Sequence, residues 1–184
     1  YQTKRVAGVG GPVVEIGRHV EIRPNVKRLS YVTHHGDIKH NYRVKKLRDT
    51  KNLQSGSVKF LMGGNMSFRR DALLKLHGFN TQYKGNYYRE ETDACMRASR
   101  IGKIIFEPSA VTYHDTAAHG GTRDVMHLEN FLYWYFRNTV LLFFQHFEIK
   151  NAVKKTWRQC RKYIKGVRNG TIKINRDYLI ASTS

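Results

Sequence analysis

The chain has 184 residues, enough for one domain or for one part of a larger domain. Hydrophobic residues make up 40% of it, which is enough for a core and excludes a wholly disordered chain. Lysine and arginine number 33 against 14 acids, and the formal charge of +19 predicts a polyanionic neighbour such as nucleic acid, anionic lipid or a phosphorylated substrate. Two cysteines are too few for a disulfide framework or a zinc cluster and indicate a reducing compartment.

The first predicted elements are two short strands, Val6–Val9 and Val13–Ile16, around a Gly10-Gly11-Pro12 turn. Residues 17–56 are polar, basic and irregular, and predict a long loop of the kind that is usually functional or mobile. The three histidines within residues 34–40 are compatible with metal binding, although a polar loop in a histidine-rich chain explains them better.

The middle of the chain predicts one strand and two helices. The strand is Val58–Met62, and a helix follows at Arg69–Leu76, which Gly78 ends in the left-handed conformation. A second helix is predicted at Glu90–Ile101, where small and apolar residues form one stripe and a glycine follows.

Two further strands, Lys103–Phe106 and Ala110–Tyr113, precede a long apolar and aromatic helix near Met126–Phe147. Arg137 interrupts this helix, and its charge-free part is too short for the roughly 20 residues of a membrane-spanning helix. From residue 150 to residue 176 there are ten basic residues and no acid, and spacings of three and four predict a basic helix. This segment is either a solvated tail or an arm that contacts a membrane surface or phosphates.

Three acids, Glu90, Glu91 and Asp93, lie within four residues at the start of the second helix. Helix capping explains one acid at this position and three poorly. Acids this close repel one another, and a metal, a cation or a catalytic task normally offsets the repulsion. Adjacent glutamates diverge on a helix, so one can face a cleft as a general base while the other anchors. Asp93 could bind nearby amides or a sugar hydroxyl.

Other candidate residues lie before and after the acids. Gly63 and Gly64 allow close approach of the backbone to a ligand, and Asn65 adds an amide able to bind hydroxyls. His114 stands at a strand end, where α/β proteins often form sites, and is either functional or structural. Arg137, in its aromatic helix, either snorkels to solvent or reaches a phosphate.

Several segments together resemble one enzyme family. In chain order they are Gly63–Leu73, Gly78–Asn80, Arg89–Asp93, Gly102–Pro108 and Val111–His114. In this order and spacing they resemble the C-terminal half of the GT-A catalytic domain of family 2 inverting glycosyltransferases, over about residues 5–16 and 57–145. The expected fold class is therefore α/β, with a mixed sheet, followed by a basic helical extension.

The resemblance implies roles for the acids. Glu90 and Glu91 take the place of the family's Glu-Asp pair, whose second member is the catalytic base. Glu91 is therefore expected to be the base, with Glu90 as its rival, although a glutamate in second place departs from the pattern. Asp93 matches the acid that follows the pair. Arg89, which directly precedes Glu90, is expected to bind substrate.

The resemblance also implies binding and metal residues. Gly63, Gly64 and Asn65 match the loop that meets the acceptor and the donor sugar. His114 matches a strand-end histidine that helps to ligate a divalent metal, Mg²⁺ or Mn²⁺. Arg137, with the asparagine after it, resembles an aromatic-Arg-Asn element that can approach the donor diphosphate.

The implied reaction is a metal-dependent hexosyl transfer with inversion. Glu91 deprotonates an acceptor hydroxyl, the oxygen attacks the anomeric carbon of a nucleotide-diphospho-sugar, and the metal stabilises the leaving diphosphate. The acceptor is expected to be a glycan, a lipid-linked molecule or a protein, with no specific nucleic-acid partner. The expected location is cytoplasmic and peripheral, at the cytoplasmic face of an anionic membrane.

One departure from the family is large. Its N-terminal half binds the nucleotide and carries an Asp-x-Asp motif, and no Asp-x-Asp occurs in this sequence. Residues 1–146 are therefore expected to be a partial GT-A domain, inactive alone, and residues 147–184 a basic, partly helical extension. Two alternatives stay open: a basic nucleic-acid-binding module, which the charge permits without any recognisable motif, and a non-catalytic, membrane-associated partner module.

Overall fold

The computed structural model describes residues 5–16, 27–32, 38–44, 53–115 and 128–169. It has mixed α/β architecture, as the sequence predicts, with two four-stranded sheets and four helices in these residues. The predicted histidine cluster within residues 34–40 lies outside the residues whose side chains are described.

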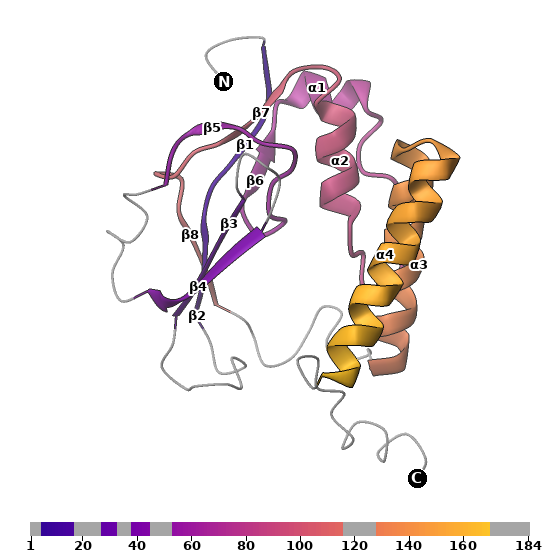
Figure 1. Cartoon of the computed structure of the whole chain (residues 1–184). Helices are drawn as coiled ribbons and strands as arrows, with labels where there is room; N and C mark the ends of the chain where they lie inside the picture. The colour runs from indigo at the N-terminus through magenta and orange to yellow at the C-terminus, as the bar shows by residue number, and fades with distance from the viewer. Residues whose placement is uncertain (1–4, 17–26, 33–37, 45–52, 116–127, 170–184) are drawn as a thin grey trace. The chain divides into compact units, whose positions relative to one another are not determined.

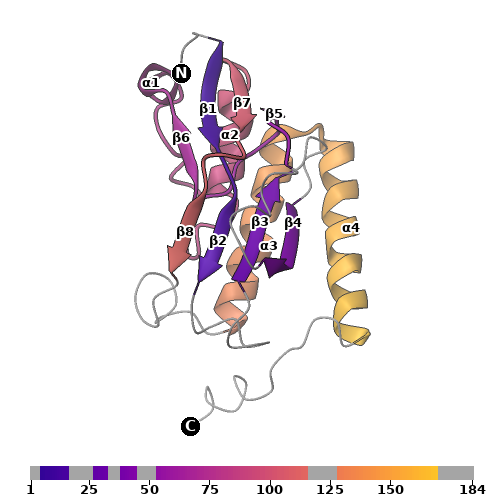
Figure 2. The same ribbon diagram turned by 90° about the vertical axis from the view of Figure 1, so that its left-hand side faces the viewer.

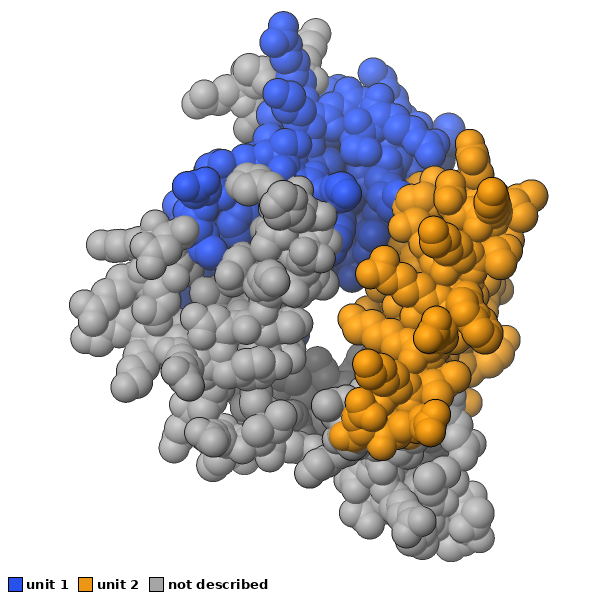
Figure 3. Space-filling view, viewed as in Figure 1, with its two compact units in different colours: residues 1–80, 90–120 blue, residues 81–89, 121–184 orange. Residues whose placement is uncertain are grey.

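The chain divides into two compact units (Figure 3). The first contains residues 1–80 and 90–120, and the second contains residues 81–89 and 121–184. The predicted domain boundary between residues 146 and 147 was drawn from the resemblance to a GT-A domain. The two compact units do not test it, and it stays a prediction.

The first sheet of the first unit has the order β5-β7-β1-β6 (Figure 1). Its inner strand β1 (Val6–Gly10) runs parallel to β7 (Lys103–Phe106) and antiparallel to β6 (Met66–Phe68). The short strand β5 (Gly56–Ser57) pairs antiparallel with β7 at the edge. The sheet is therefore mixed, because β1 pairs with one strand in each direction.

The second sheet has the order β4-β3-β2-β8 (Figure 2). Strand β2 (Val13–Ile16) is parallel to β8 (Thr112–Asp115) and antiparallel to β3 (Lys27–Val32), which pairs in turn with β4 (Ile38–Val44). The prediction that residues 17–56 are irregular is thus wrong for β3 and β4. Pairing through the backbone needs no strong alternation of side chains, so these basic strands carried little signal.

The two sheets share a strand junction, formed by Gly10–Pro12 and Glu107–Val111, where β1 passes into β2 and β7 passes toward β8. The Glu107 N–H donates to the Gly10 carbonyl at 2.8 Å, and the Thr112 N–H donates to the Pro12 carbonyl at 3.1 Å. The two connections therefore remain hydrogen-bonded side by side between the sheets.

Two helices, α1 (Arg70–Lys75) and α2 (Glu90–Ala98), complete the first unit. Ala98 is fully buried in the core, and the Gly102 N–H donates to its carbonyl at 3.0 Å. Helix α2 therefore ends three residues before the predicted Ile101, where the chain turns into β7. A left-handed Gly78 follows α1, as predicted.

The predicted strand Val58–Met62 is not a regular strand in the structure, and the nearest strands are β5 directly before it and β6 after the Met62–Asn65 turn. Val58 and Leu61 are nevertheless buried in the core. The Val58 N–H donates to the Ile104 carbonyl at 2.9 Å, and the Leu61 N–H donates to the Cys95 sulfur at 3.3 Å. Residues 58–62 thus bury apolar side chains and satisfy their backbone amides without pairing along a neighbouring strand. The strand was predicted from hydrophobicity alone, which does not distinguish these two arrangements.

The second unit is a pair of helices, α3 (Leu128–His146) and α4 (Ile149–Arg168), close to the predicted long helix and basic helix. They run antiparallel and side by side (Figures 1 and 2). Tyr163 of α4 packs edge-to-face on Phe136 of α3 at 5.2 Å, and Gln159 donates to the Tyr135 hydroxyl. No helix in the described part of the chain is long and apolar enough to cross a membrane.

Residues 81–89 pack on α3 within the second unit. The buried Asn138 amide donates to the Lys84 carbonyl at 3.0 Å. Gly85, Tyr87 and Arg89 all have a positive φ, between 53° and 79°. This backbone is strained at the two non-glycine residues, and the side chains of α3 hold it in place.

Replacing Gly85 with alanine is expected to destabilise the second unit by several kcal/mol, because a Cβ there would overlap the Trp134 ring and φ is +71°. Gly78 is the matched control, since its φ is +77° but a Cβ would meet nothing within 4 Å. Gly78→Ala is expected to cost only about 1 kcal/mol of backbone strain. Urea denaturation of both variants measures the difference, and equal losses would contradict the predicted overlap.

Candidate functional site

Glu90 and Glu91 occupy the first turn of α2, and both are half-buried. The unpaired amide groups and the dipole of a helix start favour negative charge at this position. The Glu91 carboxyl carbon lies 3.7 Å from the place of a Cβ on Gly63. The structure thus brings together Gly63 and Glu91, two candidate site residues that are 28 residues apart in the sequence.

Gly63 belongs to a tight turn, Met62–Asn65, called here the Gly-Gly turn. The Asn65 N–H donates to the Met62 carbonyl at 2.9 Å, and both glycines are exposed. Neither glycine has a positive φ, and a Cβ on Gly63 or Gly64 would meet its nearest neighbour at an ordinary 3.7 or 3.8 Å. Packing within the chain therefore does not require glycine here, whereas close approach of a ligand to this backbone would.

Burial raises the pKa of Glu90, and the negative charge of Glu91 raises it further. The cause is the repulsion that the sequence predicts for adjacent acids at a helix start. A carboxyl with a raised pKa binds its proton more tightly in the folded chain than in the unfolded chain. Glu90 therefore opposes folding once it is ionised.

Replacing Glu90 with glutamine is expected to flatten the pH dependence of stability. Between its ordinary value of 4.5 and its raised value in the folded chain, Glu90 binds more proton in the folded state, so the free energy of unfolding falls as pH rises. Glu107→Gln is a control of opposite sign, because hydrogen bonds from Ser109 lower the pKa of Glu107. Urea titrations between about pH 3 and pH 7 should show opposite slopes removed by the two variants, above pH 4.5 for Glu90→Gln and below pH 4.5 for Glu107→Gln.

Asp93 has a different environment from the two glutamates. Its side chain is 1% exposed and accepts a hydrogen bond from the Arg97 Nε at 2.8 Å. Arg97 also donates to the Leu76 and Gly78 carbonyls at 2.8 and 3.0 Å. Asp93 thus orients an arginine that satisfies the carbonyls at the end of α1, and this geometry supports a structural role for it.

Asn65 also has partners within the chain. Its side-chain amide donates to the Pro12 carbonyl at 2.9 Å and to the Ala110 carbonyl at 2.5 Å. Both amide hydrogens are therefore used to join the two connections of the strand junction. Asn65 fixes the Gly-Gly turn against the junction, a role that sequence reasoning, which predicted a hydroxyl-binding amide, did not find.

His114 lies in β8 with an exposed side chain. Among the residues that the structure describes, no group of three or more His, Cys, Asp or Glu could hold a metal ion. The described residues therefore do not fit a metal site by themselves, and His114 would need ligands from elsewhere. The predicted Mg²⁺ or Mn²⁺ stays a prediction.

Arg89 and Arg137 belong to the second unit. The Arg89 guanidinium lies 4.8 Å from the Tyr88 ring centroid. Arg137 donates to the Gln82 carbonyl and, at 2.9 Å, to the Asn138 side-chain oxygen. The Arg137 guanidinium thus helps to hold the 81–89 segment against α3. Neither of the two roles predicted from the sequence, snorkelling to solvent or binding a phosphate, includes these contacts.

One site neighbour was missed by sequence reasoning. Cys95 lies one helical turn after Glu91, is fully buried, and accepts the Leu61 N–H. Burial raises the pKa of the Cys95 thiol to about 12, and the charge of Glu91 also raises it. A thiol so rarely ionised is a poor nucleophile, so Cys95 packs beneath the acids instead of reacting. The sequence did contain a signal for this position, because residues four apart on a helix, such as Glu91 and Cys95, lie on the same face.

Comparison with known proteins adds no family to this picture. No protein-family model matches the chain, and no match is found among curated proteins. Any assignment of function rests on the residues and geometry described above.

Proposed function

We propose that the chain forms the acceptor-binding part of an inverting glycosyltransferase of GT-A type, which transfers a hexosyl group from a nucleotide-diphospho-sugar to an acceptor hydroxyl. One observation supports the proposal above the others. The half-buried carboxylate of Glu91 lies against the exposed Gly-Gly turn, whose glycines the chain's own packing does not require. An acidic side chain beside an open stretch of backbone is suited to accept a proton from a bound hydroxyl.

The reaction assigns one task to each part of this site. The exposed backbone of the Gly-Gly turn holds the acceptor, and Glu91 removes the proton of its hydroxyl. The oxygen then forms a bond to the anomeric carbon as the bond from that carbon to the diphosphate breaks, and the configuration inverts. The proton remains on Glu91 until it passes to solvent, and the electron pair of the broken bond leaves with the nucleoside diphosphate.

The positions of the other candidates support this division of roles. Asp93 and Asn65 fix α2 and the Gly-Gly turn through Arg97 and the strand junction. Glu90 remains the rival base, because burial and the charge of Glu91 raise its pKa and so make its carboxylate a stronger proton acceptor. A divalent cation is part of the proposal for the complete enzyme, and no step is assigned to it here because the described residues do not form its site.

The proposal is tested by a transfer assay on the enzyme that this chain is proposed to form or to be part of. The protein is incubated with UDP- or GDP-linked hexoses and Mn²⁺, with glycan and lipid-linked acceptors, and release of UDP or GDP is measured. Acceptor-dependent release that a Glu91→Gln variant lacks is the expected result. Release that is the same without acceptor, or the same in the variant, would contradict the proposed reaction.

A matched variant tests the Gly-Gly turn. Gly63→Ala is expected to fold normally, because the nearest atom to the added Cβ would be in the Glu91 side chain, at an ordinary 3.7 Å. Transfer should nevertheless fall by about 10- to 100-fold, since the methyl group displaces an acceptor that must approach the backbone closely. Normal stability with normal transfer would remove the turn from the acceptor site.

A further inference from the structure

Helix α4 leaves a row of apolar side chains exposed. The row consists of Ile149, Val153, Trp157 and Ile164, which are 74%, 54%, 66% and 56% exposed. Spacings of four, four and seven place these side chains on one face of the helix. Contiguous exposed apolar side chains usually mark a surface that binds another protein or a membrane, so this apolar row indicates a binding surface.

The same helix packs on α3 through a different face. Ala152 is fully buried, Gln159 donates to the Tyr135 hydroxyl, and Tyr163 packs on Phe136. The apolar row lies next to this packed face, roughly 60° to 100° around the helix from it by the 3.6-residue repeat. The contact between the helices therefore leaves the apolar row uncovered.

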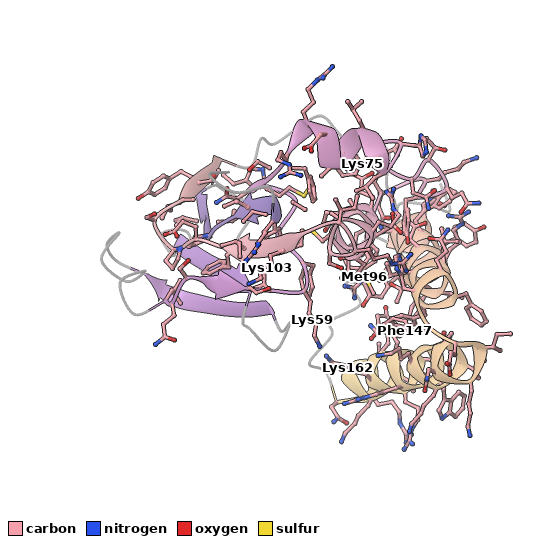
Figure 4. All side chains as sticks on the ribbon, turned by 90° about the horizontal axis from the view of Figure 1, so that it is seen from above. Lys59, Lys75, Met96, Lys103, Phe147 and Lys162 are labelled. Carbon is pink, nitrogen blue, oxygen red and sulfur yellow. The ribbon has the colours of Figure 1, made fainter. Side chains whose placement is uncertain are left out.

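A basic row borders the apolar row on its other side. It consists of Lys150, Lys154, Arg161, Lys165 and Arg168. The whole of α4 carries eight lysines and arginines and no acid, and all five members of the basic row are exposed. In Figure 4 nitrogen-tipped side chains project from α4, with Lys162 among them. Apolar and cationic rows thus run side by side along one exposed surface.

We propose that this surface binds an anionic lipid bilayer, with α4 lying in the plane of the membrane surface. The apolar row would enter the boundary between headgroups and acyl chains, where tryptophan is favoured. The basic row would remain at the level of the anionic headgroups. This inference uses only the second unit and does not depend on the proposed sugar transfer.

The composition of the surface favours lipid over the other polyanions. A nucleic-acid backbone pairs with the basic row but offers nothing to cover four exposed apolar side chains in line. An acidic protein groove could cover both rows, but a helix with no acid and eight cations provides no charge pattern to select one orientation. A bilayer surface presents both chemistries, in the order in which α4 displays them.

The test measures co-sedimentation of the full chain with vesicles. Vesicles of phosphatidylcholine with about 30 mol% phosphatidylserine are compared with phosphatidylcholine alone at about 0.1 M salt. Binding to the anionic vesicles is expected, with little binding to the neutral ones. A blue shift of tryptophan emission that is lost in Trp157→Phe would place Trp157 in the bilayer.

Three variants with exposed substitutions separate the contributions. Arg161→Gln with Lys165→Gln is expected to weaken vesicle binding by about 30-fold, since each cation near an anionic surface contributes about fivefold. Val153→Gln with Trp157→Gln is expected to weaken it by at least about tenfold. Lys59→Gln with Lys75→Gln, which removes the same charge from the first unit, is the control and should bind as the parent chain does (Figure 4).

Three results would overturn the inference. One is the absence of binding to anionic vesicles. Another is a loss in the lysine control equal to that in the α4 charge variant. The third is unchanged binding by the apolar variant together with equally tight binding to duplex RNA or DNA at the same salt. In that case the surface would be a general polyanion site.

Discussion

Replacing Glu91 with glutamine is expected to lower the rate of the proposed sugar transfer by about 10²- to 10⁴-fold, while donor binding changes by no more than a few fold. Glutamine preserves the size of the side chain that lies over Gly63 but cannot accept the acceptor proton. The loss should appear in kcat and not in the affinity for the donor, because the base acts only as the hydroxyl oxygen attacks.

Glu90→Gln is the matched control for this experiment. It makes the same change one residue earlier on α2, at a carboxyl whose pKa is raised by burial and by the charge of Glu91. Its transfer rate should remain within about tenfold of the parent rate if Glu91 is the base. A large loss in Glu90→Gln with near-normal turnover in Glu91→Gln would assign the base to Glu90. Near-normal turnover in both would remove this pair from catalysis.

Replacing Gly11 with alanine is expected to destabilise the first unit by about 3 kcal/mol or more. A Cβ on Gly11 would lie 2.6 Å from the Glu107 carbonyl oxygen and closer still to that of Ala110. These are backbone atoms of the strand junction, so they cannot move aside as a flexible side chain would. The β1–β2 connection or the β7–β8 connection must therefore shift, and the Asn65 bonds with them.

Gly63→Ala is the control for the stability experiment, because it adds the same methyl group in the same unit without a close contact. Urea denaturation followed by circular dichroism should show a lower midpoint for Gly11→Ala and a nearly unchanged one for Gly63→Ala. If both variants lose stability equally, the strand junction is not packed as closely as the structure indicates. If neither does, the connections have room that the distances exclude.

Asn65 shows why part of the site could not be predicted. The sequence places an amide after two glycines, and an amide in a ligand loop predicts contact with hydroxyls. Its two acceptors, the Pro12 and Ala110 carbonyls, are 53 and 45 residues away in the sequence. Only the pairing of β1 with β7 brings them together, and no local pattern encodes that pairing.

The acids show a similar division between local and distant information. Helix-terminus chemistry predicts that Glu90, Glu91 and Asp93 crowd the start of α2, and the structure confirms this position. Which of them faces an open surface depends on the neighbours of the helix. Asp93 faces Arg97 and the core, whereas Glu91 faces the Gly-Gly turn.

The features that depend on neighbours along the chain could be predicted from the amino-acid sequence. These include the positions of β1, β2, β7, α1 and α4, the left-handed Gly78 and the excess of cations on α4. Three other features became known only from the folded chain: the β3–β4 hairpin, the partners of Asn65 and Asp93, and the exposure of the apolar row on α4. The physical reason is that periodicity and end effects act within a few residues, whereas burial and hydrogen-bond partners depend on segments that meet only when the chain has folded.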